Sequence, residues 1–260
     1  MTEALPEPAS DWAMFFDFDG TLAEIAPTPG AVQVRPGLID HLRSIQDALD
    51  GAVAIVSGRP LEEIDGFLAP LQLSAAGLHG LERRGSNGDV DNFVPSKAII
   101  ETLRPELRAF AAVTPGVQLE DKRLSLALHY RSAPDQGPAC HSAMLQAVDH
   151  AEGALEVLLG KMVVELKPTG GDKGTAIEAF LREPPFLGRR PFFAGDDVTD
   201  EVGFASVNRL DGVSVCIGTK ADSAARHQVE SVAKFSAWLD HAAGLLAPEE
   251  QPTTRKGVTV

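Results

Sequence analysis

The stretch AMFFDFDGTL, residues 13–22, joins a short apolar run to an acidic turn. The run has the length and the non-alternating apolar character of a strand that is buried on both faces. On an extended chain residues i and i+2 project from the same side, so Asp17 and Asp19 share one side of this strand end. Gly20 lets the chain turn sharply, and Thr21 offers a hydroxyl and a backbone N–H. Two carboxylates this close repel each other unless a cation lies between them or one is protonated.

A solvated Asp-Gly turn would explain the same pair without any function, so the motif has to be judged with the rest of the chain. An EF-hand calcium loop is excluded, because that loop needs glycine at its sixth position and an acid at its twelfth. The two remaining interpretations of the pair are a cation site and a plain turn.

Four other short apolar runs share this character and are separated by helical patterns. They are residues 52–56 (AVAIV), 73–76 (LSAA), 191–194 (PFFA) and 213–217 (VSVCI), and the helical patterns cover 38–49, 174–181 and 231–246. Strands that alternate with helices predict an α/β fold with a parallel sheet and helices on both faces. Ligands of such sheets bind outside the carboxyl ends of the strands. Four polar residues are expected at those ends: Asp17, Asp19, Ser57 and Asp196.

Residues 98–166 follow a different pattern, which predicts an α+β insert of antiparallel type. The expected order is helix 99–113, strands 116–120 and 123–131, helix 138–151, and strands 154–159 and 161–166. In the second strand Leu124, Leu126 and Leu128 alternate with small or polar residues, so we expect one buried face. This αββαββ insert interrupts the parallel core. We therefore expect a discontinuous core at 11–97 and 168–247, a cap domain at 98–167, and a disordered tail at 248–260.

A second acidic motif, GDDVTDE at residues 195–201, follows the 191–194 run. It adds four acids to the expected site: Asp196, Asp197, Asp200 and Glu201. A pocket of at least four carboxylates is unfavourable when empty, and Mg²⁺ held by one or two carboxylates and a substrate phosphate would suit it. The alternative is an acidic helix N-terminus capped by Asp196 or Asp197.

Two weaker signals concern phosphate binding. Ser57-Gly58-Arg59-Pro60 offers a hydroxyl and backbone N–H groups at a strand-to-helix turn, which suits a phosphate. Ordinary capping by Ser57 would explain the same residues. Lys173, in the glycine-rich stretch 170–175, opposes the dipole at a helix start, and this local conflict indicates a function. The alternative is a solvated lysine, and the spacing of a Walker A loop is absent.

Composition excludes several classes of partner. The 260 residues include 23 Lys and Arg against 37 Asp and Glu, for a formal net charge of -14. Such a chain is a poor match for nucleic acid or for an acidic membrane surface, because phosphates are bound by clustered Lys and Arg. No apolar stretch approaches the roughly 20 residues of a membrane span. Nothing in the sequence indicates an obligate protein partner.

The compartment is predicted from the cysteines and the N-terminus. Cys140 and Cys216 give neither a disulfide framework nor a CxxC metal spacing, and we expect both to be small buried residues. The first ten residues, MTEALPEPAS, lack the basic and apolar regions of a signal peptide. We therefore expect a cytoplasmic protein.

Taken together, DFDGTL, Ser57, Lys173 and GDDVTD, in this order, resemble the haloacid-dehalogenase superfamily of Mg²⁺-dependent phosphohydrolases. Further stretches narrow the likeness: 13–31, 77–80 with 82–84, 128–131, 164–168 and 195–201. They are similar to the trehalose-6-phosphate phosphatases, from about residue 13 to 240. The resemblance implies a Rossmann-like core with a cap inserted between the second and third motifs, where the predicted insert lies.

The resemblance also implies roles. Asp17 would be the nucleophile that forms an aspartyl-phosphate, and Asp19 the general acid and base. Mg²⁺ would be held by the Asp17 side chain, the carbonyl oxygen of Asp19, and Asp196. Ser57 and Lys173 would hold the phosphate. Two further acids would orient the metal ligands, and which of them touches the metal's waters stays open: Asp197 and Asp200.

Substrate choice is expected to come from the cap. A disaccharide offers many hydroxyls, which need carboxylates and amines as partners. The resemblance places sugar contacts at three residues: Glu120, Lys122 and Glu165. Three further residues are weaker candidates for sugar contacts, because an exposed position on a strand would explain each of them equally well: His129, Arg131 and Lys167. His79 could face the pocket or simply satisfy a loop.

The implied activity is hydrolysis of trehalose 6-phosphate to trehalose and phosphate, the last step of trehalose biosynthesis. A related phosphatase, for sucrose phosphate or a glucosylglycerate-type phosphate, is the alternative of the same class. A catalytically inactive regulatory domain is the alternative of a different class. The presence of all the expected acids and of Lys173 argues against that alternative.

Overall fold

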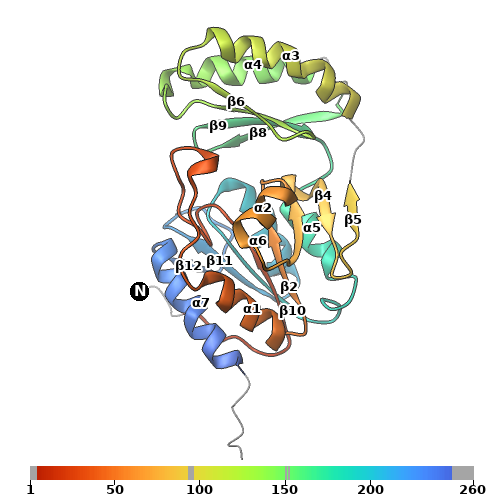
Figure 1. The fold of residues 1–260 in the computed structure, drawn as a ribbon, viewed down its shortest axis with the longest axis vertical. Coiled ribbons are helices and arrows are strands. Elements are labelled where there is room, and N and C mark those ends of the chain that lie inside the picture. The colour runs from red at the N-terminus through yellow and green to blue at the C-terminus, as the bar shows by residue number, and fades with distance from the viewer. Residues whose placement is uncertain (1–4, 93–96, 150, 152, 248–260) are drawn as a thin grey trace, which may run out of the picture.

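The computed structural model describes residues 5–92, 97–149, 151 and 153–247. The expected disordered tail at 248–260 lies outside these residues. Figure 1 shows two stacked parts: an eight-stranded sheet with its helices below, and a smaller four-stranded sheet under a pair of helices above. No helix in the described ranges has the length and apolar character needed to cross a lipid bilayer.

The larger sheet is built on the predicted strands. Its spatial order is β12 (His227–Val229), β11 (Val213–Ile217), β10 (Arg190–Gly195), β1 (Trp12–Phe16), β2 (Val53–Val56), β3 (Ser74–Gly77), β4 (Glu82–Arg84) and β5 (Val90–Asn92). The strands from β12 to β3 pair in parallel, and β4 and β5 extend the edge in antiparallel. All five residues of β1 are buried, as expected for a central strand covered on both sides.

Helices cover both faces of this sheet. The larger ones are α1 (Leu38–Ala48), α2 (Leu61–Leu68), α5 (Lys173–Phe180), α6 (Glu201–Arg209) and α7 (Val232–Leu246). Successive strand residues point to opposite faces, and Phe15 packs on Phe180 of α5 whereas Phe16 packs on Phe235 of α7. The expected doubly covered parallel sheet is thus confirmed. Three short 3₁₀ segments join these elements: η1 (Pro29–Ala31), η2 (Leu78–Gly80) and η4 (Val198–Asp200).

The smaller part has the expected αββαββ order. It consists of α3 (Lys97–Val113), β6 (Gln118–Asp121), β7 (Leu126–His129), α4 (Gly137–Asp149), β8 (Leu155–Gly160) and β9 (Val163–Pro168), with the 3₁₀ segment η3 (Pro134–Gln136) before α4. The sheet is antiparallel in the order β6-β7-β9-β8. Leu126, Leu128 and Leu166 point into a core shared with α3 and α4. We call residues 98–167 the cap, and its exact bounds stay a prediction.

The expectation of a single buried face on 123–131 is wrong. Ser125 and Ala127 are as completely buried as the alternating leucines, because the other face of the cap sheet lies over the larger part. Leu124 precedes β7 and packs instead with Leu78 and Leu81 of the larger part. The cap is therefore held by apolar contact as well as by polar groups.

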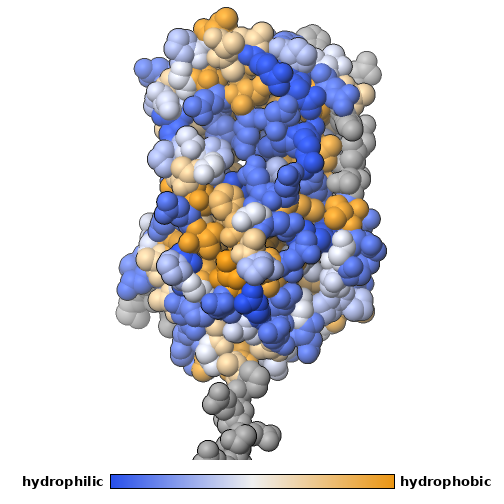
Figure 2. Space-filling model, viewed as in Figure 1, coloured by the Kyte–Doolittle hydropathy of each residue, from blue (hydrophilic) through white to orange (hydrophobic). Residues whose placement is uncertain are grey.

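The surface in the same view is mixed. Figure 2 shows hydrophobic residues gathered on the eight-stranded part, and further ones on the cap, among hydrophilic residues. Exposed apolar side chains that occur singly are ordinary in folded proteins. The chemistry is instead concentrated in the space between the two parts.

Candidate active site

The site lies where the carboxyl ends of β1, β2 and β10 face the cap sheet. A cavity of about 210 Å³ opens there. Residues of the larger part that line it include Asp17, Asp19, Ser57, Arg59, His79, Lys173, Asp196 and Asp197, and those of the cap include Glu120, Lys122, His129, Arg131 and Glu165. The predicted position of the site at the strand ends is thus where the acidic motifs meet.

Asp17 and Lys173 form the buried base of the cavity. Lys173 Nζ donates to Asp17 Oδ1 at 2.7 Å and to Asp200 Oδ1 at 2.6 Å, and the Thr21 hydroxyl donates to Asp17 Oδ2 at 3.2 Å. Burial raises the pKa of Asp17 well above its usual value, with Asp200 and Asp196 adding to the effect and Lys173 opposing it. Burial alone would lower the pKa of Lys173, but Asp17 and Asp200 outweigh it and raise the pKa. The lysine is therefore an ammonium ion, not a solvated surface residue.

Asp200 holds the second acidic motif in place. Its Oδ2 accepts from the backbone N–H groups of Asp196 at 2.9 Å and Asp197 at 2.8 Å, and it is completely buried. A Cβ at Gly195 would lie 2.3 Å from the carboxyl carbon of Asp200, so glycine is needed at the end of β10. Lys220 donates to the Asp196 carbonyl oxygen from the loop after β11. The backbone at Asp196 is thereby held by Asp200 through its N–H and by Lys220 through its carbonyl oxygen.

Three carboxylates are grouped closely enough to share a metal ion. One oxygen from each of Asp17, Asp196 and Asp200 lies within 4.8 Å of the others. Burial, with Asp200 and Asp197 adding to its effect and Lys173 and Lys220 opposing it, raises the pKa of Asp196 to about 7. Oxygen donors and an excess of negative charge are what Mg²⁺ requires of a site. The residues present therefore fit a divalent cation.

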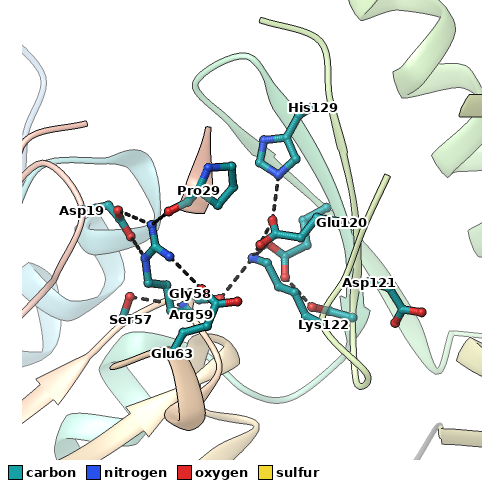
Figure 3. Close-up of polar contacts among 12 residues, drawn as sticks. Asp19, Pro29, Ser57, Gly58, Arg59, Glu63, Glu120, Asp121, Lys122 and His129 are labelled. Atoms are coloured by element: carbon teal, nitrogen blue, oxygen red, sulfur yellow. Dashed lines mark hydrogen bonds and ion pairs between the residues drawn. The ribbon is translucent and has the colours of Figure 1, made fainter. Parts of the chain in front are cut away.

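Asp19 points away from this group and toward Arg59. Arg59 Nε and Nη2 donate to the two carboxylate oxygens of Asp19 at 2.6 Å and 2.7 Å. Figure 3 shows the guanidinium between Asp19, Pro29 and Glu63. The predicted metal contact of Asp19 uses its carbonyl oxygen, so this arrangement leaves that prediction open.

Ser57 lies at the end of β2 and is almost completely buried on the cavity wall. Its hydroxyl accepts from the Arg59 backbone N–H at 3.2 Å, and its carbonyl accepts from the His79 N–H at 3.0 Å. The turn between β2 and α2 is thus joined to η2. In η2, Leu78 and His79 both have positive φ, 50° and 55°, which is uncommon outside glycine. Such backbone strain is typical of functional sites.

A cluster of polar side chains on the cap sheet faces this turn. Glu165 accepts from Lys122 Nζ at 3.0 Å and from the Ser125 hydroxyl at 2.6 Å, and lies 3.4 Å from His79 Nε2. Burial would raise the pKa of Glu165, but Lys122 and then His79 and Ser125 outweigh it and hold the pKa below its usual value. Burial lowers the pKa of His79 against the effect of Glu165. The structure thus places His79 against the cap acid.

Glu120 and His129 form a second cap pair. His129 Nε2 lies 2.7 Å from Glu120 Oε2, and Figure 3 shows the imidazole pointing at that carboxylate. Burial opposes ionisation of Glu120, but His129 and Lys122 outweigh it and lower its pKa. Arg131 Nη1 donates to the Ala26 carbonyl oxygen at 2.8 Å, across the gap between cap and core. Both His129 and Arg131 line the cavity.

Lys167 is not part of this site. Its ammonium contacts the Gly171 carbonyl oxygen and lies 2.5 Å from Glu156, and it does not line the cavity. Nor is it exposed, because only 3% of the residue is accessible. It lies near the end of β9 and contacts the connection to α5, so the exposed strand position offered by the sequence is wrong.

Several residues that line the cavity are not predicted from the sequence, and two of these contributors are Arg59 and the segment 25–32. The sequence marks Arg59 only as part of a phosphate-binding turn. It does not mark the segment 25–32 as a wall, although the cavity is lined by Ile25, Ala26, Pro27, Thr28, Pro29 and Val32. The second had a signal, since a chain that leaves β1 at its carboxyl end has to pass that edge before α1 begins. The first had none beyond a charged residue beside Ser57.

The fold is that of the capped phosphatases of the haloacid-dehalogenase superfamily. A solved structure of a phosphatase of that superfamily from Bacteroides thetaiotaomicron matches with a TM-score of 0.60, at 17% identity, over 92% of this chain and 98% of that one. The C-terminal domain of the Candida albicans trehalose-6-phosphate phosphatase matches with a TM-score of 0.80, at 22% identity, over 90% and 93%. At these identities the likeness shows the fold.

The family follows from the sequence comparison. The trehalose-phosphatase family model matches residues 15–236. The Escherichia coli K12 trehalose-6-phosphate phosphatase is 43% identical over 243 residues, which cover 92% of this chain and 91% of that protein. The chain belongs to the trehalose-phosphatase family, and it is a phosphatase that hydrolyses a phosphomonoester.

Proposed function

We propose that this protein is a Mg²⁺-dependent phosphatase that hydrolyses trehalose 6-phosphate to trehalose and phosphate through an aspartyl-phosphate. One observation carries the proposal: a buried carboxylate held by Lys173 lies at the base of a cavity whose roof carries acids and an amine from the cap. The base suits phosphoryl transfer, and the roof suits a sugar with many hydroxyls.

In the first step Asp17 attacks the phosphorus. The bond from phosphorus to the sugar oxygen breaks, its electron pair stays on that oxygen, and Asp19 supplies the proton that makes the leaving alcohol neutral. In the second step a water attacks the aspartyl-phosphate and gives its proton to the Asp19 carboxylate. The bond from phosphorus to Asp17 then breaks, which restores the enzyme and releases phosphate.

The cations of the site oppose the charge of the reacting groups. Lys173 carries its positive charge within hydrogen-bond distance of Asp17, so it can hold a phosphate oxygen beside the nucleophile. Ser57 is at the neighbouring strand end, where its hydroxyl can donate to the same phosphate. Both roles are those expected from the sequence.

A bound Mg²⁺ would be held by Asp17 and Asp196, with the carbonyl oxygen of Asp19 as the third protein ligand. It would offset the repulsion between the phosphate and the carboxylates. Asp200 uses both oxygens to orient its neighbours, and Asp197 has its backbone N–H in the same network. We therefore assign to these two residues the support of the metal ligands.

The sugar would lie between the cap cluster and the 25–32 wall. Glu120, Lys122 and Glu165 offer charged acceptors and a donor to hydroxyls. Pro27 and Pro29 oppose them with apolar surface from the core side. A cavity with one polar and one apolar wall fits a pyranose ring, whose edges are polar and whose faces are apolar.

The test is phosphate release with and without Mg²⁺ from four esters: trehalose 6-phosphate, sucrose 6-phosphate, glucose 6-phosphate and p-nitrophenyl phosphate. We expect a Mg²⁺-dependent preference for trehalose 6-phosphate that is lost in Asp17→Asn. Equal turnover of all four would leave a phosphatase without the proposed specificity. Preference for sucrose 6-phosphate would favour the alternative sugar phosphatase.

A further inference from the structure

Arg59 is fixed on all sides in the wall of the cavity. Its guanidinium makes the bidentate contact with Asp19, and it also donates from Nη1 to Glu63 at 2.7 Å and from Nη2 to the Pro29 carbonyl oxygen at 3.0 Å. Its carbon lies 4.8 Å from the ring centre of Phe67, and only 7% of the residue is exposed. A planar guanidinium held this way has one orientation.

The backbone of Arg59 is fixed as well. Its N–H donates to the Ser57 hydroxyl, and its carbonyl accepts from the Leu78 N–H at 3.0 Å. Gly77 approaches that carbonyl so closely that a Cβ there would lie 2.7 Å from the oxygen. The position of the guanidinium is thus set by β2, η2 and the 25–32 wall together.

Asp19, by contrast, follows the end of β1 on a turn, and its side chain is about a third exposed. Among the described residues, its carboxylate has hydrogen bonds with Arg59 alone. The orientation of the Asp19 carboxylate therefore depends on the guanidinium. A general acid has to be within hydrogen-bond reach of the leaving oxygen, so its orientation affects the rate.

We propose that Arg59 is a positioning residue that orients the Asp19 carboxylate for proton transfer to and from the reacting oxygens. This inference rests on the proposed role of Asp19 in the hydrolysis. In the first step Asp19 gives its proton to the sugar oxygen, and the guanidinium holds the carboxylate that results. In the second step this carboxylate accepts the proton of the water, which restores the acid for the next turnover.

Two other roles for Arg59 make different predictions. If it bound the substrate phosphate directly, it could offer one N–H of Nη1 at most without giving up a contact, because four hydrogen bonds already use the other four of its five donors. If it were only a structural ion pair, it would resemble Arg84. Arg84 makes a bidentate contact with Asp65 at 2.7 Å and 2.7 Å, with side-chain exposures of 6% and 34% against 8% and 34% for Arg59 and Asp19. Arg84 does not line the cavity.

The experiment compares two leaving groups. A sugar alkoxide is strongly basic and has to be protonated as it leaves, whereas p-nitrophenolate is a stable anion at neutral pH and leaves without a proton. We would measure kcat/KM, which covers the steps up to departure of the leaving group, with trehalose 6-phosphate and with p-nitrophenyl phosphate. The variants are Arg59→Met and Arg59→Lys, and the matched controls are Arg84→Met and Arg84→Lys, each with its Tm.

Arg59→Met should lower kcat/KM for trehalose 6-phosphate by about 10²-fold, the cost of a misplaced catalytic group. Its kcat/KM for p-nitrophenyl phosphate should stay close to that of the wild type. A burst of nitrophenolate should appear as well, because the attack of water still needs the base and the aspartyl-phosphate accumulates. Arg59→Lys should fall in between, since one ammonium cannot make the bidentate contact.

An equal fall with both esters would overturn the proposal in favour of a contact with phosphate or metal, and unchanged values with both would overturn it outright. The Arg84 variants should lose stability without changing the ratio of kcat/KM for trehalose 6-phosphate to kcat/KM for p-nitrophenyl phosphate. If Arg59→Met does not fold, Arg59→Lys still tests the proposal, because its kcat/KM should fall for trehalose 6-phosphate and not for p-nitrophenyl phosphate. If the wild type does not hydrolyse trehalose 6-phosphate, the proposed substrate fails, and the ratio of glucose 6-phosphate to p-nitrophenyl phosphate still tests Arg59.

Discussion

Lys122 of the cap donates from Nζ to the carbonyl oxygen of Gly58 in the core, at 3.0 Å. Gly58 follows Ser57 directly, so a cap residue touches the turn that we assign to the phosphate (Figure 3). The same ammonium lies 3.0 Å from Glu165 and 4.0 Å from Glu120. Burial would lower the pKa of Lys122, but Glu165 and Glu120 outweigh it and raise the pKa. One charge thus joins the sugar side of the cavity to the phosphate side.

Lys122→Met should therefore raise KM for trehalose 6-phosphate and also lower stability. Loss of a hydrogen bond from a charged group to a substrate hydroxyl costs about 1.5–3 kcal/mol. The variant also leaves Glu165 buried without its main counter-charge, a change that costs about 3–5 kcal/mol when a buried pair is broken. Steady-state kinetics and Tm measure the two effects. Lys234→Met, at an exposed position on α7, is the control. A Lys122 variant with unchanged KM would exclude a substrate contact.

Gly20 shows how closely the two acidic motifs approach. It has a φ of +83°, and a Cβ there would lie 2.2 Å from Asp196 Oδ2. Gly88 has the same φ of +83° with no atom within 4 Å of such a Cβ. A side chain at either glycine should therefore have the same backbone cost, about 1–2 kcal/mol. Only at Gly20 would the added Cβ also clash with Asp196.

Gly20→Ala should displace the Asp196 carboxylate and abolish Mg²⁺ stimulation, whereas Gly88→Ala should lower Tm slightly and keep full activity. Mg²⁺ binding can be followed by isothermal titration calorimetry as well as by phosphate release. If both variants bind Mg²⁺ like the wild type, Asp196 is not a ligand in the proposed site.

The central elements were predictable because one physical pattern marks each of them. Residues 13–16 are all apolar, and the structure buries every residue of β1. Lys173 conflicts with the dipole of its own helix, and the structure resolves the conflict with Asp17 and Asp200. In both cases the local sequence contains the reason for the structure.

Other features could not be predicted, because their reasons lie in distant contacts. The strands β4 and β5 have the sequences ERR and VDN, and they form only by pairing at the edge that β3 provides. Ser125 is polar and yet buried. Its burial is possible because its hydroxyl donates a hydrogen bond to Glu165, 40 residues later. The ion pair of Asp19 with Arg59 likewise spans 40 residues. No local periodicity records such pairs.

Stability of the metal-free protein should fall as pH rises toward neutrality. The pKa of Asp196 is raised to about 7 in the folded state from 3.8, so between these values the folded protein binds more protons than the unfolded chain. Stability from this group is therefore fully present below pH 3.8 and is lost as pH rises from there through the folded value of about 7, by at most about 1.4 kcal/mol per pH unit. Asp17, whose pKa is also raised by burial, acts in the same direction.

The measurement is Tm against pH in the presence of a chelator, for the wild type and Asp196→Asn. The variant should be more stable than the wild type at pH 7.5, which lies just above the pKa of Asp196. The two curves of Tm against pH should converge in acid. Added Mg²⁺ should stabilise the wild type most at high pH, because the metal competes with the proton. A wild-type curve that rises with pH through this range would contradict the raised pKa.

Leu124 should control how firmly the cap is held on the core. It packs with Leu78 and Leu81, and Leu78 precedes His79 in the strained η2 segment. Gly171, in the connection from the cap back to α5, also approaches Leu81, since a Cβ there would lie 3.0 Å from its side chain. The apolar contact therefore lies beside the point where the chain re-enters the core.

Leu124→Ala should weaken this contact at a cost of about 2–5 kcal/mol, the range of buried leucine truncations. Because His79 and Glu165 meet only when the cap lies on the core, KM for trehalose 6-phosphate should rise while kcat/KM for the small ester p-nitrophenyl phosphate changes less. Leu128→Ala is the matched control, since Leu128 is buried within the cap's own core. It should lower Tm without faster amide hydrogen exchange at Leu78 and His79. If exchange in η2 is the same in both variants, the cap is held by its polar contacts, chiefly those of Lys122, and Leu124 only fills space.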